Sequence, residues 1–122
     1  LAGHVEVGDW VIFGGFSGVH QYCHLGAHSF IGMYAVIKKD VPAYIMISSH
    51  PSIPKGINIE GLKRRNFSQE QIRNIRKGYK IVYRSGSKLS DAVFELEKLI
   101  ELQPEIKLFV DSLKSAKRGI IR

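Results

Sequence analysis

The chain has 122 residues, of which 44% are hydrophobic and 24% are charged, and its formal net charge is +7. This composition excludes a disordered chain, and because no apolar run approaches the roughly 18–20 residues that span a bilayer, we expect no membrane insertion. The single cysteine, Cys23, excludes a disulfide framework and favours a reducing compartment, so we expect a cytoplasmic protein.

Residues 1–42 form seven consecutive six-residue repeats in one phase. They read LAGHVE, VGDWVI, FGGFSG, VHQYCH, LGAHSF, IGMYAV and IKKDVP. The first position is always a large apolar residue, the second is small in five repeats, and the fifth is small or β-branched. Such a hexapeptide repeat predicts a triangular parallel β-helix with three repeats per turn, in which the first and fifth positions face the core.

The turn of three repeats predicts which residues stack on one another. Residues 18 positions apart share a column, so we expect His4, Tyr22 and Asp40 in one column and Trp10 beside His28 in another. The second-position glycines are expected at tight bends, where glycine tolerates backbone angles that a Cβ would penalise. For His24 and His28 taken individually, the plainest interpretation is a surface or interface role.

Residues 43–67 are expected to form an irregular connector between two unlike halves. The repeat ends at Pro42, and Pro51 and Pro54 interrupt the segment after it. The stretch GINIEGLKRRNF is polar and basic, with too few apolar residues to contribute to a core.

Residues 68–122 are expected to form a small helical domain. Ser68 and Gln71 form a capping box that opens one helix, and Gly86 stands where a C-terminal cap belongs. Ser90 is expected to open a second helix and Pro104 to lie in the first turn of a third. The third helix would bury the apolar residues Ile106, Phe109, Val110 and Leu113.

The second half also carries the excess positive charge. Residues 61–122 contain fifteen Lys or Arg against seven Asp or Glu, whereas residues 1–60 contain three against four. Arg76 and Lys80 are one helical turn apart and share a face of the first predicted helix. Such a surface attracts anionic partners of any kind, but no recognised motif supports nucleic-acid binding.

The order of several motifs resembles the UDP-N-acetylglucosamine O-acyltransferase family. The motifs are LAGHVEVGD, GGFSGVHQYCHLGAH, NIEGLKRRNFS, YRSG and RGIIR, and they cover nearly the whole chain. The resemblance implies a left-handed coil and a homotrimer with active sites between subunits. It implies transfer of a 3-hydroxyacyl chain from acyl carrier protein to UDP-N-acetylglucosamine, at the start of lipid A synthesis. It also implies no cofactor and no metal, because the thioester donor is already activated.

The same resemblance assigns roles around the coil. The family's general base is a histidine in a run upstream of the LAGH motif, so none of these 122 residues supplies it and the chain alone is expected to be inactive. His4 matches a histidine that contacts substrate. His20 matches a histidine that contributes to the family's active site, and Gln21 matches a glutamine that contacts substrate. Met33 matches a position that acts as a ruler for the acyl chain, where methionine in place of glycine predicts a shorter chain.

The connector and the first helix complete the predicted site. By the resemblance, Asn58, Glu60, Arg64 and Arg65 hold the nucleotide. Arginine suits this role because its planar fork of donors matches phosphate oxygens. The basic helical face around Arg76 and Lys80 suits acyl carrier protein, which is acidic.

Other interpretations stay open at this point. The protein could be another hexapeptide acyltransferase, acting on an amino sugar, although the NIEGLKRR segment argues against it. It could instead be a non-catalytic module that trimerises and docks acyl carrier protein. His20, His24 and His28 are four residues apart and suggest a metal site, but the repeat points them in different directions. Arg64 and Arg65 could also form an ordinary solvated turn.

Overall fold

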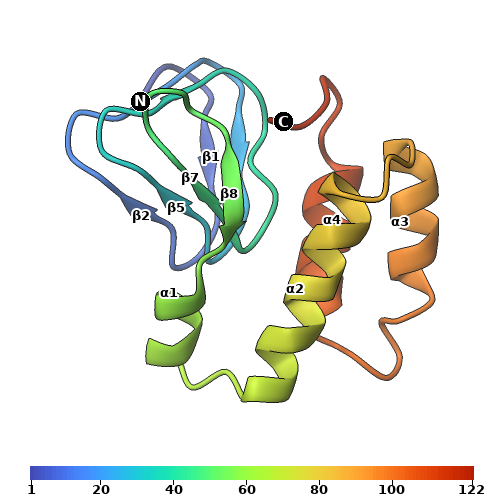
Figure 1. The fold of residues 1–122 in the computed structure, drawn as a ribbon. Coiled ribbons are helices and arrows are strands. Elements are labelled where there is room, and N and C mark those ends of the chain that lie inside the picture. The colour runs from blue at the N-terminus through green and yellow to red at the C-terminus, as the bar shows by residue number, and fades with distance from the viewer.

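The computed structural model describes all of residues 1–122, and its first part is a three-sided parallel coil (Figure 1). Each side consists of short parallel strands, and the pairs β1–β4, β2–β5 and β3–β6 join residues three repeats apart, such as Glu6 with His24. The predicted period of the coil is therefore confirmed. The six strands are β1 (Glu6–Val7), β2 (Ile12–Phe13), β3 (Gly18–Val19), β4 (His24–Leu25), β5 (Phe30–Ile31) and β6 (Val36–Ile37).

The bend of each repeat lies at its fourth position, not at its second. The backbone φ is positive at six successive fourth positions, which are His4, Trp10, Phe16, Tyr22, His28 and Tyr34. The prediction that the second-position glycines occupy the bends is therefore wrong. A Cβ at Gly14 or Gly26 would lie 2.3 Å from a backbone nitrogen of the next coil. These glycines are needed because successive coils pass too close for any side chain, not because of their φ angles.

The seventh repeat does not keep the phase of the first six. Strand β7 (Ile45–Ile47) pairs in parallel with β5, with Phe30 opposite Met46, and Leu25 bridges to Val41. Val41 thus occupies a first position rather than a fifth. The predicted column of His4, Tyr22 and Asp40 is wrong for its third member, because Asp40 lies beside His24. The shift is stabilised by apolar burial, since it places Val41, which is 1% exposed, over Leu25.

The connector is ordered and contributes to the core. Strand β8 (Pro54–Ile57) pairs antiparallel with β7, and helix α1 (Ile59–Arg64) follows it. Leu62 of α1 is fully buried, so the expectation that this segment lacks core residues is wrong. The reason is that the side chain of Asn58 caps α1, and the resulting turn of helix points Leu62 inward.

Three longer helices complete the chain: α2 (Gln69–Tyr83), α3 (Leu89–Glu97) and α4 (Ile106–Lys114). The capping box of Ser68 and Gln71 is present as predicted. Ser90 does not open α3, because the helix starts at Leu89 and Lys88 is its N-cap. Pro104 precedes α4 rather than lying in its first turn. The predicted apolar face of α4 is confirmed, since Ile106, Phe109, Val110 and Leu113 are all buried.

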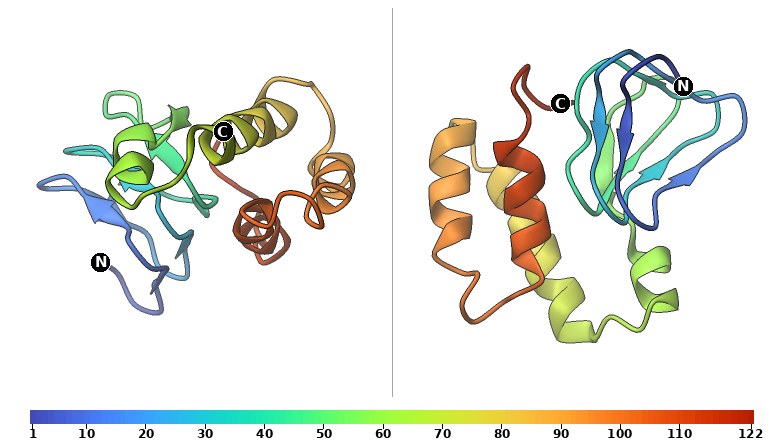
Figure 2. Two further views of the ribbon diagram at one scale, coloured as in Figure 1. Left: turned by 90° about the horizontal axis from the view of Figure 1, so that it is seen from below. Right: turned by 180° about the vertical axis from the view of Figure 1, so that it is seen from behind.

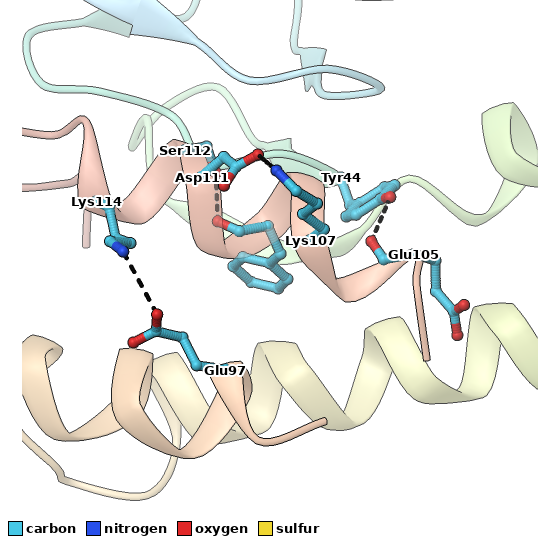
Figure 3. A network of polar contacts seen from close by, with 8 residues as sticks. Tyr44, Glu97, Glu105, Lys107, Asp111, Ser112 and Lys114 are labelled. Carbon is cyan, nitrogen blue, oxygen red and sulfur yellow. Dashed lines mark hydrogen bonds and ion pairs between the residues drawn. The ribbon is translucent and has the colours of Figure 1, made fainter. Parts of the chain in front are cut away.

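Coil and helices share one core of 25 buried residues. Helix α4 lies against the coil, where the Tyr44 hydroxyl donates to the Glu105 carbonyl (2.7 Å) and the Ala43 N–H donates to Ser112 Oγ (2.9 Å); Figure 3 shows the Tyr44 contact. After α4 the chain returns to the coil, where the Ile121 N–H donates to the Asp40 carbonyl (2.9 Å) (Figure 2). The helices fall short of the length and hydropathy of a membrane-spanning segment.

Candidate functional site

The predicted site residues lie on different corners of the triangular coil. The first corner, residues 2–5 and 20–23, joins the β3–β6 side to the β1–β4 side. The second corner, residues 8–11 and 26–29, leads to the side that contains β2 and β5, and the third corner is formed by residues 14–17 and 32–35. His4, His20 and Gln21 lie on the first corner, Met33 lies on the third, and the connector residues lie near the second.

On the first corner, His4 stacks on Tyr22. The ring centroids are 4.8 Å apart and the planes differ by 3°, as the predicted column requires. His20 and Gln21 directly precede Tyr22, and all four side chains are exposed. The first corner therefore presents two imidazoles and an amide to the outside of the coil, groups that can exchange hydrogen bonds with a sugar.

A polar cavity of about 340 Å³ adjoins this corner. Residues that follow α4 line part of it, and the Arg118 guanidinium lies 5.5 Å from the centre of the Tyr22 ring. Burial raises the pKa of Asp40, and the hydrogen bond from the His24 N–H opposes that shift. Arg118 was not predicted as a site residue, because nothing in the sequence indicates that the tail returns to the first corner. The lining residues are Glu6, Tyr22, His24, Asp40, Ser115, Lys117 and Arg118.

The second corner carries a compact group around Arg65. Arg65 Nε donates a hydrogen bond to His28 Nδ1 (2.9 Å), and the guanidinium carbon lies 5.4 Å from the centre of the Trp10 ring. His28 is 8% exposed, so the surface alternative of its expected surface or interface role is wrong. The coil period already placed Trp10 beside His28, but only the fold brings Arg65 to them. Burial is the main cause that lowers the pKa of His28; Arg65 adds to the shift and Asp9 opposes it.

Asn58 holds α1 against the second corner. Its Nδ2 donates to the carbonyl of His28 (3.1 Å), and its Oδ1 accepts from the N–H of Gly61 (3.2 Å). Asn58 is 2% exposed, and its amide is thus engaged within the protein. Glu60 and Arg64 are exposed on the same short helix. Of the four connector residues predicted to hold a nucleotide, Glu60 and Arg64 face outward, Arg65 is partly buried and Asn58 is buried.

The third corner presents apolar and aromatic side chains. Met33 is 55% exposed, and the next residue, Tyr34, stacks on Phe16 with ring centroids 5.4 Å apart. Met33 therefore stands on an open, apolar face, which suits contact with an acyl chain.

The basic face of α2 borders a depression of about 250 Å³. Arg76 and Lys80 line it as one group, and Lys55 of β8 adds a further positive charge that was not predicted. Its apolar walls are Ile57, Ile59 and the ring of Tyr79. The sequence does not indicate Lys55, because β8 is far from α2 along the chain and meets it only in the fold.

The three histidines that suggested a metal site are separated. His20 lies on the first corner, His24 lies in β4, and His28 lies on the second corner with its Nδ1 engaged by Arg65. No three His, Cys, Asp or Glu side chains in the structure are grouped so that they could hold a metal ion.

Comparison with known proteins gives one consistent family. The family model described as UDP N-acetylglucosamine O-acyltransferase, domain 2, matches residues 40–121. The chain is 50% identical over all 122 residues to the acyl-[acyl-carrier-protein]–UDP-N-acetylglucosamine O-acyltransferase of Pseudomonas entomophila, covering 47% of that protein. It is 51% identical to the protein of the same name from Pseudomonas putida, again covering 47%. The chain thus spans about half the length of the curated relatives it matches.

Solved structures agree with this result. The fold matches LpxA from Acinetobacter baumannii with a TM-score of 0.93 at 42% identity, over 98% of this chain and 46% of that one. It matches the UDP-N-acetylglucosamine acyltransferase LpxA of Bacteroides fragilis with a TM-score of 0.94 at 39% identity, over 100% of this chain and 48% of that one. The family model covers well over half of the chain, and the chain therefore belongs to the UDP-N-acetylglucosamine O-acyltransferase family.

Proposed function

We propose that the protein transfers a 3-hydroxyacyl chain from acyl carrier protein to the 3-hydroxyl of UDP-N-acetylglucosamine, the first step of lipid A biosynthesis. The observation that carries the proposal is the 50% identity over the whole chain to a relative whose name states the acyl donor and the acceptor. Because a thioester donor is already activated, the transfer needs a base for the sugar hydroxyl and no cofactor. The family resemblance assigns this base to a histidine that is not among the motifs found in these 122 residues.

We infer that the active site forms between copies in a homotrimer with left-handed coils and a carboxyl-terminal helical domain. The support is the placement of the candidate residues. Within one chain, His4, Arg64 and Met33 lie near three different corners of the triangle, so a single copy does not gather them around one substrate. A three-fold assembly brings a corner of one copy against a different corner of the next.

Each corner then has a part in the reaction. His4, His20 and Gln21 contact the sugar. Arg64 and Arg65 bind the diphosphate through charge-assisted hydrogen bonds, and Glu60 accepts hydrogen bonds from the uridine. Asn58 contributes indirectly, because its amide fixes α1 to the coil.

Acyl carrier protein is proposed to dock on the basic face of α2. Arg76 and Lys80, joined by Lys55, surround a depression with apolar walls. Positive charge steers an acidic partner to the surface, and the apolar walls supply contact area once water is displaced. A reaction that draws its acyl chain from acyl carrier protein is proposed to take place in the cytoplasm.

Replacing Arg64 with alanine should raise the Michaelis constant for UDP-N-acetylglucosamine about tenfold, and that for the acyl donor less than about twofold. A hydrogen bond to a charged group contributes about 1.5–3 kcal/mol, and the exposed Arg64 makes none within the chain that its loss would disturb. The measurement is steady-state kinetics of the full-length enzyme with each substrate varied in turn. Lys63→Ala, an exposed neighbour on the same helix, is the matched control; equal changes in both constants for Arg64→Ala would contradict the role.

Met33 is proposed to limit the length of the acyl chain. Removing its side chain in Met33→Gly should lengthen the groove that we propose for the acyl chain between subunits at this corner, so that kcat/KM for the longest acyl donors rises about tenfold relative to the shortest. The size of the effect follows from burying a few extra methylene groups at about 0.8 kcal/mol each. The assay is the full-length enzyme with acyl carriers of graded length. Met33→Leu, which conserves volume, should keep the original preference, and an unchanged preference in Met33→Gly would refute the proposal.

A further inference from the structure

The guanidinium of Arg65 is held on several sides. The only side-chain hydrogen bond of Arg65 runs from Nε to His28 Nδ1, and the guanidinium carbon lies 5.4 Å from the centre of the Trp10 ring. Its Nη2 is buried without a hydrogen-bond partner and packs against Gly61, where an added Cβ would lie 2.5 Å from it. Leaving a donor buried and unpaired is unfavourable, so other contacts must fix this orientation.

His28 is the only hydrogen-bond acceptor that holds the Arg65 side chain. An imidazole nitrogen accepts a hydrogen bond only when it carries no proton, so His28 must be neutral with its proton on Nε2. The ring cannot turn away freely, because it stacks on Tyr44 (centroids 5.6 Å apart) and meets the edge of Phe67 (5.1 Å). The carbonyl of His28 is also fixed, since Asn58 Nδ2 donates to it.

The surroundings of His28 favour the neutral form. Burial lowers the pKa of His28, and the adjacent guanidinium of Arg65 lowers it further. Asp9 is the one nearby acid that opposes this shift, and the hydroxyl of Tyr44, whose ring stacks on His28, donates elsewhere, to the Glu105 carbonyl. Protonation would turn Nδ1 into a donor that faces another donor, and the hydrogen bond to Arg65 would be lost.

We propose that neutral His28 is a positioning residue that aims Arg65 at the diphosphate of the nucleotide sugar. This inference rests on the proposed function, in which Arg65 binds that group. His28 does not itself touch the substrate and acts only through the orientation of the guanidinium. Preorganisation of this kind strengthens binding because the ordering of a long side chain has already taken place in the free protein.

Two substitutions of His28 distinguish the effect of the hydrogen-bond acceptor from the effect of the aromatic ring. His28→Phe keeps an aromatic ring against Tyr44 and removes the hydrogen-bond acceptor. The positive φ of residue 28 (64°) does not exclude phenylalanine, because Phe16 has a positive φ at the equivalent corner position. His28→Asn keeps an oxygen near the place of Nδ1, does not titrate, and tolerates a positive φ. The ligand is UDP-N-acetylglucosamine, and its Kd for the full-length protein is measured by calorimetry, with thermal unfolding as a check on folding.

At pH 7.5, His28→Phe should raise the Kd about tenfold, and His28→Asn less than about threefold. For the unsubstituted protein the Kd should rise on acidification below pH 6.5, because burial and then Arg65 lower the pKa of His28 from its ordinary value of 6.5, so that it gains its proton only below that pH. His28→Asn should weaken this pH dependence, because it removes the contribution of His28 and leaves that of the other histidines of the site. Comparison of the pH series of the unsubstituted protein with that of His28→Asn tests the inference even where His28→Phe folds poorly; identical pH dependence in the two proteins would overturn it.

Arg65→Ala distinguishes a failure of the positioning role of His28 from a failure of the proposed function on which that role rests. If Arg65→Ala leaves the Kd unchanged, the proposed role of Arg65 in nucleotide binding fails. If Arg65→Ala weakens binding while His28→Phe does not, the positioning role alone is overturned. In the Arg65→Ala background, His28→Phe should add no further loss, because both changes remove the same interaction. An added tenfold loss in that double variant would show that His28 acts by another route.

Discussion

Replacing Gly26 with alanine should lower the free energy of unfolding by about 3 kcal/mol. The added Cβ would lie 2.3 Å from the backbone nitrogen of Ala43, with the Ala43 Cα and the carbonyl carbon of Pro42 both at 2.7 Å. All three are backbone atoms, so no side chain can rotate to make room, and overpacking of this kind costs about 1–3 kcal/mol, occasionally more. Relief requires the coils to separate where the Gly26 N–H donates to the Val41 carbonyl (2.8 Å).

Gly15→Ala is the matched control for this experiment. Gly15 also lies at a corner of the coil, but nothing lies within 4 Å of its would-be Cβ. Its substitution should change the stability by less than about 0.5 kcal/mol. Both variants are compared by urea unfolding followed by circular dichroism. An equal loss of stability in both variants would mean that the close approach of successive coils does not explain why the second position of each repeat holds a small residue.

Replacing Phe109 with alanine should cost about 4 kcal/mol, the upper range for deleting a buried aromatic ring. Phe109 of α4 is fully buried, and its ring meets the edge of Tyr44 from the coil with centroids 6.3 Å apart. It also lines the place where α2 packs through Gly78, together with Leu96 of α3. The substitution therefore leaves a cavity where the coil and the three long helices meet.

Phe94→Ala provides the comparison, since Phe94 is 62% exposed on α3. Its loss should change the free energy of unfolding by less than about 1 kcal/mol. The measurement is again chemical unfolding, with probes of both strand and helix content. A single transition in Phe109→Ala would show that coil and helices still unfold together; two separated transitions would contradict one shared core.

The repeat determined much of the fold without reference to tertiary structure. A hydrophobic residue every sixth position can be buried only if the chain turns with that period, so the parallel pairing of β1 with β4 and the His4–Tyr22 stack followed from spacing alone. The capping box of α2 and the buried face of α4 were also predicted from the sequence, because both depend on residues within one or two helical turns. The family resemblance came from the same local motifs.

Interactions between distant segments were decided only by the tertiary structure. The seventh repeat departs from the phase of the first six and places Val41 over Leu25, because burial of an apolar side chain outweighed the six-residue spacing of the sequence. Leu62 entered the core because a capped turn of helix formed where the composition had indicated a loop. Glycine at the second position was recognised from the sequence, but its reason, the contact between successive coils, required the coils to be stacked.

The candidate site shows the same division. The sequence by itself determined the chemistry available, from the imidazoles of His4 and His20 to the guanidinium groups of Arg64 and Arg65, because these follow from residue type and motif. It also placed Trp10 beside His28 through the period of the coil. Only the tertiary structure brought Arg65 onto that pair and separated the candidates onto three corners, since both depend on contacts between residues far apart along the chain, which no local pattern encodes.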